Sequence, residues 1–147
     1  MKALGIEMPK TSLFTRAVKY NTYYAIDTGG VVRECKERND GCDDKFYNIA
    51  NYCTDKAILE QRALHETINR LLWRYSMEHD GDKIDFTNGN QSKYVIIFNK
   101  QTKSFELNQL WCLIIIGAPY FLTRETAEAA IKEIIEPFMK AHPEFKW

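Results

Sequence analysis

The chain has 147 residues, with 20 basic and 20 acidic side chains and a formal net charge of zero at pH 7. A hydrophobic fraction of 45% with 27% charged residues is typical of a soluble globular protein and excludes wholesale disorder. The balanced charge gives no global electrostatic reason to expect a nucleic-acid coat. The longest apolar run is far shorter than the roughly 20 residues of a membrane helix, so we expect no membrane partner.

The cysteines and the first residues favour a cytoplasmic protein. Cys35, Cys42, Cys53 and Cys112 have neither the paired spacing of a zinc site nor the density of a disulfide scaffold. We expect Cys53 and Cys112 to be buried thiols, and we expect no metal and no cofactor. The first ten residues include an acid and a proline, where a signal peptide needs a continuous apolar stretch.

The first recognisable element in the chain is a hairpin. Residues 1–20 are weakly patterned, and we expect an N-terminal arm whose buried residues are chiefly Leu13, Phe14 and Val18. The β-prone runs 23–27 and 31–35 follow, separated by a short glycine-containing segment. A tight turn in which Gly29 and Gly30 both take positive φ would join them.

A long amphipathic helix is predicted after this hairpin. Residues 36–45 read as a charged loop, and the aromatic stretch 46–49 as a third strand. Thr54 is a suitable N-cap, with Asp55 in the first turn. Apolar residues then recur at helical spacing and predict a helix over residues 55–78 with one buried stripe.

The second half of the chain repeats this order of signals. Residues 94–107 read as another hairpin, and the strongly apolar run 110–116 as a central strand. Thr123 then opens a second amphipathic helix. Pro137 falls inside its pattern and predicts a kink or a break.

These elements predict an α+β fold, with a mainly antiparallel sheet and two amphipathic helices packed on one face. A β-β-α unit used twice would account for the echo between the halves. We expect a single domain over residues 1–147, composed of an N-terminal arm (1–20), a first half (21–80) and a second half (81–147).

Several short motifs follow one another in a fixed order along the chain. In the first half they are Pro9-Lys10, Tyr23-Tyr24-x-Ile26-Asp27-x-x-Gly30-x-Val32 and Asp44-x-x-Tyr47-x-Ile49-x-Asn51-Tyr52-x-Thr54. In the second half they are Ile84-Asp85-Phe86, Lys93-Tyr94-x-Ile96-x-Phe98 and Pro119-Tyr120-Phe121-x-Thr123-x-Glu125-x-Ala127-x-x-Ala130-Ile131. As a series, this pattern resembles a family of small phage and prophage proteins from gut Firmicutes and Bacteroidetes.

The resemblance implies an accessory protein of a mobile element. Counter-defence activity, such as anti-CRISPR inhibition, is one activity it suggests, and it transfers no catalytic residue to this chain. The chain also departs from the pattern, since Lys36-Glu37 stands where many relatives have a tryptophan, and Phe86 stands at another usual tryptophan position. A surface built on those indole rings would be altered here.

The sequence offers no convergent catalytic set. His65, His79 and His142 are the only histidines. His65 with Asn69 or Glu66 is a candidate ligand group, but a single imidazole on the side of a helix is more often exposed or hydrogen-bonded, and His79 at a helix end is explained by the helix dipole. The acidic cluster at residues 78–85 lacks the alternating spacing of a calcium loop, and no glycine-rich phosphate motif occurs. We therefore expect a protein that is not an enzyme, with an enzyme of unknown class as a remaining alternative.

Basic side chains and one terminal aromatic are the candidate partner-binding residues. They are Arg33, Lys36, Arg38 and Lys45 around the first hairpin, Arg62, Arg70 and Arg74 along the long helix, and Trp147 at the end. The leading hypothesis is a phage-type accessory protein that binds and inhibits a host defence protein, with a CRISPR effector as one candidate. The alternative is a small nucleic-acid-binding module that uses the helix arginines and the loop around Arg38.

Overall fold

The computed structural model describes residues 13–147, so the start of the expected N-terminal arm and the Pro9-Lys10 motif lie outside the described residues. The α+β prediction is confirmed, since helices and antiparallel strand pairs follow one another along the chain. Two compact units are present, one ending at Ala63 and the other beginning at Leu64, and each is described by itself. The assignment of the whole chain to one domain, divided after residue 80, stays a prediction.

The first unit contains the expected hairpin. Strand β1 (Thr22–Ile26) pairs antiparallel with β2 (Val32–Lys36), with Tyr24 opposite Glu34. The carboxylate of Asp27 accepts hydrogen bonds from the backbone N–H groups of Gly29 (2.8 Å) and Val31 (3.0 Å) and so shapes the turn. Only Gly30 takes a positive φ there, so the prediction for Gly29 is wrong.

Helix α1 (Gly41–Asn48) occupies the segment in which a third strand was expected. Asp40 caps this helix, because its carboxylate accepts from the N–H groups of Cys42 (2.9 Å) and Asp43 (3.1 Å). The Asp43 side chain bonds back to the cap and completes a capping box. The cap lies upstream of the aromatic run and overrides its β-propensity, so the strand prediction for residues 46–49 is wrong.

Helix α2 (Lys56–Glu78) matches the predicted long helix closely. Its cap differs from the prediction, because the carboxylate of Asp55 accepts from the N–H of Ile58 (3.2 Å). The hydroxyl of Thr54 instead donates to the carbonyl of Leu13 (3.3 Å). Asp55 rather than Thr54 therefore satisfies the first turn of α2.

The segment before β1 is held by polar contacts, and Ala17 is its residue packed against an apolar cluster. Leu13, Phe14 and Val18 are all exposed, so the prediction that they are buried is wrong. The Arg16 guanidinium instead contacts the carboxylate of Glu37, and the Ala17 N–H donates to the hydroxyl of Tyr52 (2.8 Å).

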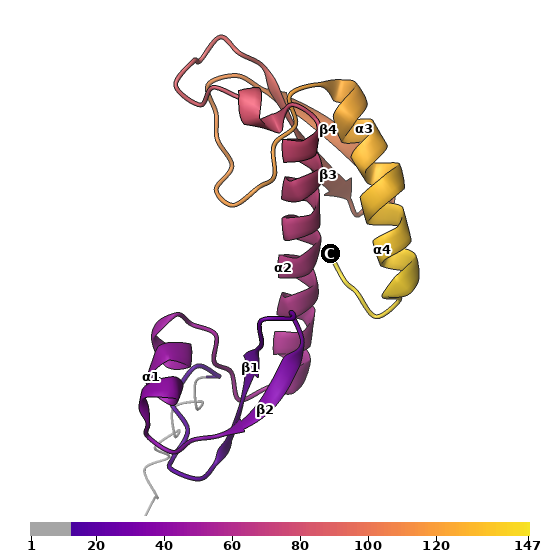
Figure 1. The fold of residues 1–147 in the computed structure, drawn as a ribbon. Coiled ribbons are helices and arrows are strands. Elements are labelled where there is room, and N and C mark those ends of the chain that lie inside the picture. Colours follow the sequence, from indigo (N-terminus) through magenta and orange to yellow (C-terminus); the bar gives the residue numbers. More distant parts are fainter. Residues whose placement is uncertain (1–12) are drawn as a thin grey trace, which may run out of the picture. The chain divides into compact units, whose positions relative to one another are not determined.

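The second unit is built on another antiparallel pair, β3 (Lys93–Asn99) and β4 (Ser104–Leu110), preceded by the short helix η1 (Gly81–Lys83). Ile96, Phe105 and Leu107 pack against one apolar core. That core also includes Ile68 and Leu72 from α2 and residues of the C-terminal helices, which lie beside the strands in Figure 1. Residues of α2 and of the C-terminal helices thus share one apolar core with the β3–β4 pair.

The C-terminal helix is interrupted where the sequence predicted. Helix α3 (Arg124–Ala130) begins after Thr123, whose hydroxyl oxygen accepts from the N–H of Thr126 (3.2 Å). A π-helical turn, η2 (Ile131–Ile135), then leads into α4 (Glu136–Ala141). The N–H of Glu136 donates to the carbonyl of Ile131, five residues back, just before Pro137. The predicted break near Pro137 therefore takes the form of this wider turn.

Each unit repeats one local arrangement, which supports the β-β-α duplication. The backbone of Tyr24 in β1 exchanges two hydrogen bonds with Cys53, and the backbone of Tyr94 in β3 exchanges two with Phe121. Cys53 and Phe121 each lie two residues before the cap of the following helix. The expected single sheet is wrong, because the four strands form two separate two-stranded sheets.

Candidate binding surface

The most unusual surface feature is an exposed apolar loop, residues 111–117, which leaves β4 and is drawn in orange in Figure 1. Five large apolar side chains of this apolar loop are exposed, namely Trp111, Leu113, Ile114, Ile115 and Ile116, with Ile116 at 98%. The prediction of a buried central strand here is wrong, because β4 ends at Leu110 and β3 and β4 form a two-stranded sheet. Cys112 is likewise exposed, against expectation, whereas Cys53 is buried as predicted.

Hydrogen bonds hold the apolar loop in a defined shape. The ammonium of Lys93, a residue only 2% exposed, donates to the carbonyl of Trp111 (2.6 Å). The hydroxyl of Tyr120 accepts from the N–H of Ile115 and donates to the carbonyl of the same residue (2.9 Å). Buried lysines are rare and costly, so the use of one at the base of this loop indicates that the position of the loop matters.

The apolar loop continues into a hollow beside α2. Trp73 is exposed, and with Gly117, Ala118 and Pro119 it lines a hollow of about 280 Å³. Runs of exposed apolar side chains are uncommon in soluble proteins unless they bind something. The loop and the hollow beside it form the candidate binding surface of the second unit.

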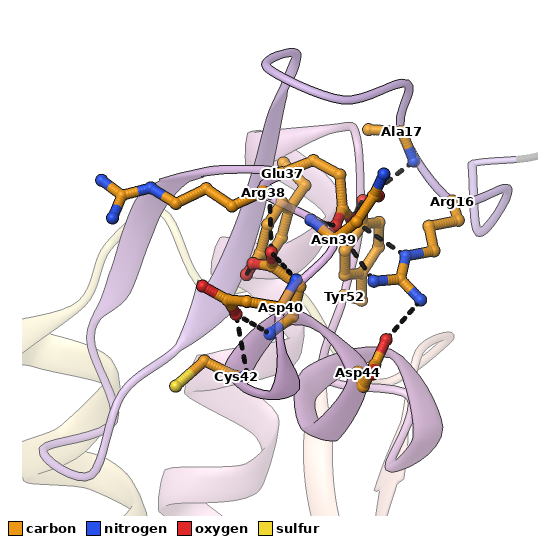
Figure 2. Close-up of polar contacts among 11 residues, drawn as sticks. Arg16, Ala17, Glu37, Arg38, Asn39, Asp40, Cys42, Asp44 and Tyr52 are labelled. Atoms are coloured by element: carbon orange, nitrogen blue, oxygen red, sulfur yellow. Dashed lines mark hydrogen bonds and ion pairs between the residues drawn. The ribbon is translucent and has the colours of Figure 1, made fainter.

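The first unit holds a buried acidic network, shown in Figure 2. Glu37 is 0% exposed, and the Arg16 guanidinium donates to its two oxygens at 3.1 and 3.0 Å. The hydroxyl of Tyr52 (2.8 Å) and the N–H of Asn39 (2.9 Å) donate to the same carboxylate. These four donors fill the roughly four lone-pair sites of a carboxylate.

A second buried carboxylate, Asp43, completes this network. It accepts from the hydroxyl of Tyr23 (2.6 Å) and from the N–H of Arg38 (2.7 Å). Burial favours the neutral acid, but these hydrogen bonds outweigh burial and lower the pKa of Asp43 to about 2. Burial together with Glu37 raises the pKa of Tyr52 to about 12.

The network holds segments of the first unit together. Its charge-assisted hydrogen bonds join the segment before β1 to the end of β2 and to α1. Four donors from different segments converge on Glu37, so this carboxylate holds these segments together. The sequence analysis missed its role, although the Asp40-x-x-Asp43 capping spacing was a usable signal for the adjacent helix.

The predicted basic patch does not form one surface. Arg33 and Lys36 lie in β2 at positions of opposite parity, so their side chains leave opposite faces of the hairpin. Arg33 pairs with Asp27 (2.5 Å), and the Lys36 ammonium donates to the hydroxyl of Thr22 (2.6 Å). Arg38 and Lys45 are exposed beside and within α1.

The remaining predicted residues divide between the two units. Arg62 is exposed on the part of α2 that belongs to the first unit, while Arg70 and Arg74 are exposed on the part in the second. The Arg70 guanidinium donates to the hydroxyl of Thr67 (3.3 Å) and lies 3.8 Å from the carboxylate of Glu66. Trp147 is half-buried among Phe98, Phe105 and Phe145 and is not a free terminal anchor.

Histidines and acids do not converge on a metal site in the part of the chain that the structure describes. No group of three or more His, Cys, Asp or Glu side chains could hold a metal ion there. His65 contacts the ring of Phe145, and the Nδ1 of His79 lies 2.8 Å from the carbonyl of Tyr75. Among the described residues, no helix is long and apolar enough to span a membrane.

Comparison with protein-family models, curated proteins and solved structures finds no match to this chain. The apolar loop and the chemistry of its surroundings are therefore the basis for assigning a function.

Proposed function

We propose that this protein is a non-enzymatic inhibitor that binds another protein through the apolar loop and blocks it sterically. The main observation in support is a run of large exposed apolar side chains on a loop that Lys93 and Tyr120 hold by hydrogen bonds. Apolar and aromatic side chains are the usual anchors of protein interfaces. An ordered loop also loses less conformational entropy on binding than a flexible one.

The chemistry of the loop favours a protein partner over nucleic acid. Residues 111–117 contain no charged side chain, whereas nucleic-acid binding depends on Lys and Arg contacts to phosphates. Arg33 and Arg70, two of the predicted binding arginines, already have carboxylates beside them. Contacts to phosphate would compete with these ion pairs.

The resemblance to phage and prophage proteins suggests the class of partner. We propose a host defence protein, with a CRISPR effector as the first candidate. Steric inhibition requires about one inhibitor per effector, because a blocking protein does not turn over.

A cleavage assay with a panel of purified CRISPR effectors tests this function. We expect inhibition to become complete near an equimolar ratio and Ile116→Asp to weaken it by about tenfold or more, because a charge would be buried in an apolar interface. Ile49→Asp is the matched control, since Ile49 is also exposed, at 70%, but lies in the first unit. It should inhibit like the native protein.

Three results would contradict the proposal. Inhibition at far less than equimolar protein would indicate an enzyme, and full inhibition by Ile116→Asp would remove the loop from the interface. The third result would come from sedimentation analysis. If the native protein were a dimer and Ile116→Asp a monomer, the loop would be an interface between two copies of this chain.

A further inference from the structure

The outer edge of strand β4 in the second unit is open. On the opposite side of the pair, the backbone of Tyr94 in β3 exchanges hydrogen bonds of 2.8 and 2.9 Å with Phe121. The N–H and C=O groups of successive strand residues point alternately to the two sides. Those of Tyr94 face away from β4, and Tyr94 pairs with Gln109. The backbone groups of Phe105, Leu107 and Gln109 therefore point away from β3, toward the open edge.

This edge lacks the usual protection. Within residues 13–147, no other backbone segment bonds to these outward groups. Edge strands are normally protected from pairing by charged side chains, especially lysine, or by proline. Strand β4 has no lysine, arginine or proline, and Glu106 is its one charged residue. By contrast, the edge strand β2 of the first unit carries Arg33, Glu34 and Lys36.

The two faces of β4 define what could lie beside it. Phe105 and Leu107 pack against the apolar core, whereas Glu106 and Asn108 are exposed on the other face. The side-chain amide of Asn99 donates to the Glu106 carboxylate (2.8 Å). A strand added to this edge would continue both faces, with apolar side chains next to Phe105 and Leu107 and a basic side chain next to Glu106.

We propose that the partner protein adds an extended segment to β4 as a third strand of the β3–β4 sheet. The inference rests on the proposed function for the nature of the partner, a protein. Main-chain hydrogen bonds supply affinity in this mode of binding, and alternate side chains supply specificity. The apolar loop begins directly after β4, at Trp111, so the same partner reaches the loop from the added strand.

The surroundings of β4 favour a different protein over a second copy of this chain. An antiparallel pairing of two copies of β4 would bring the apolar loop of each copy toward Lys100 and Lys103 of the other, in the turn before β4. The apolar loop would then lie beside charged side chains and gain little burial from the contact.

Short synthetic peptides test this edge without an effector. Each has about eight residues, with valine, isoleucine or phenylalanine at alternate positions and threonine or lysine between them. Amide exchange measured by NMR should slow by about tenfold or more at Phe105, Leu107 and Gln109 when a peptide binds. Exchange at the edge of β2 should not change. Replacing lysine by glutamate in the peptide should weaken binding, because it would place an acid next to Glu106.

Two N-methylated forms of the tightest-binding peptide test the main-chain bonds on the native protein. One form is methylated at its apolar positions and the other at its polar positions. Only one of these two sets of N–H groups faces β4 in an added strand. One form should therefore lose about tenfold or more in affinity while the other keeps it. Equal binding by both forms would contradict strand addition.

Gln109→Pro removes one outward N–H of β4, a change that an edge strand tolerates where the N–H faces solvent. Gln109→Val is the matched control, because valine keeps the N–H. Glu34→Pro makes the same type of change at the edge of β2. We expect Gln109→Pro to weaken peptide binding and inhibition of an effector by about threefold or more, and both controls to behave like the native protein.

The outcomes separate this inference from the proposed function. Unchanged exchange at β4 with every peptide would overturn the inference. A native dimer that Gln109→Pro converts to a monomer would also overturn it, because β4 would then pair with a second copy. Peptide binding without inhibition of any effector would contradict only the proposed function. Inhibition that Ile116→Asp weakens and Gln109→Pro leaves intact would contradict only the strand addition.

Discussion

At the scale of single residues, the buried carboxylates of Glu37 and Asp43 hold the first unit together. Each accepts several hydrogen bonds, and each faces a tyrosine hydroxyl, Glu37 with Tyr52 and Asp43 with Tyr23. Burying a charge is costly unless hydrogen bonds compensate for the lost water. Asp43 should therefore contribute to stability only while it remains ionised and bonded.

The first prediction is that Asp43 makes the stability of the fold depend on pH in the acidic range. Its folded-state pKa of about 2 lies below the ordinary value of 3.8. The ionised form therefore contributes about 2 kcal/mol above about pH 4, and this contribution is lost as the pH falls toward 2. We expect Asp43→Asn to lower the unfolding free energy near neutral pH, measured in urea, and the difference from the native protein to shrink on acidification.

Asp44→Asn is the control for that measurement. Asp44 is half-exposed and forms one ion pair with Arg16 (2.6 Å), so its loss should cost well under 1 kcal/mol. Equal effects of the two substitutions at neutral pH would show that the network around Asp43 does not stabilise the fold.

The tyrosines of the network give a prediction at high pH. Burial is the main cause that raises the pKa of Tyr52 to about 12. Burial also raises the pKa of Tyr23, and by more. Their neutral forms stabilise the fold below about pH 10, and this contribution is lost as the pH rises toward the folded-state values. In an ultraviolet titration, we expect the tyrosinate signal of these residues to appear only together with unfolding. Their titration near pH 10 in the folded protein would contradict the network.

The start of α2 illustrates what patterns predict and what they miss at the level of an element. Periodicity placed the helix within a residue or two, because a long amphipathic stripe leaves few alternatives. The choice between the adjacent cap candidates Thr54 and Asp55 depended on a distant contact. The Thr54 hydroxyl is engaged by the carbonyl of Leu13, which no local pattern reveals.

The cap at the start of α2 gives a prediction at the scale of an element. Asp55→Ala should destabilise the protein by about 1 kcal/mol, because it removes the acceptor for the N–H of Ile58. Thr54→Ala should cost less, since its hydroxyl makes only a long bond in an exposed segment. Urea unfolding measures the free energy of unfolding of both variants. A larger effect of Thr54→Ala would show that Thr54 is the cap of α2, as the sequence pattern predicted.

The apolar loop was mispredicted for a different physical reason. A run of apolar residues normally indicates burial, but a central strand needs neighbours on both sides, and β4 pairs only with β3. The hairpins and the capped C-terminal helix were predictable because their signals are local. The bond from Lys93 to the loop and the half-buried position of Trp147 depend on contacts between residues distant in the sequence, so they became apparent only in the structure.

Lys93 tests how the loop is held. Lys93→Met keeps the length of the side chain and removes both the buried charge and the bond to the Trp111 carbonyl. Stability should change by less than about 1 kcal/mol, because removing a buried charge offsets the lost bond, while amide hydrogen exchange in residues 111–118 should rise several-fold. Lys100→Met, at an exposed position in the turn after β3, is the control. Unchanged exchange in the Lys93 variant would mean that other contacts position the loop.

For the whole molecule, the proposed function is recognition of a protein partner through the apolar loop. The buried carboxylate Glu37 accepts four hydrogen bonds within the first unit, whereas five large exposed apolar side chains lie within one loop of the second unit. In such a molecule the energy of binding comes from apolar surface removed from water. Its specificity comes from the shape in which that surface is held.

Photo-crosslinking in host cells that carry the defence system tests this claim most directly. A photoreactive amino acid is placed at position 116 in one protein and at position 49 in another, since both sites are exposed and apolar. We expect position 116 to crosslink to a defence protein and position 49 not to do so. Crosslinks from position 116 only to nucleic acid or to a second copy of this chain, or equal crosslinking from both positions, would contradict the account.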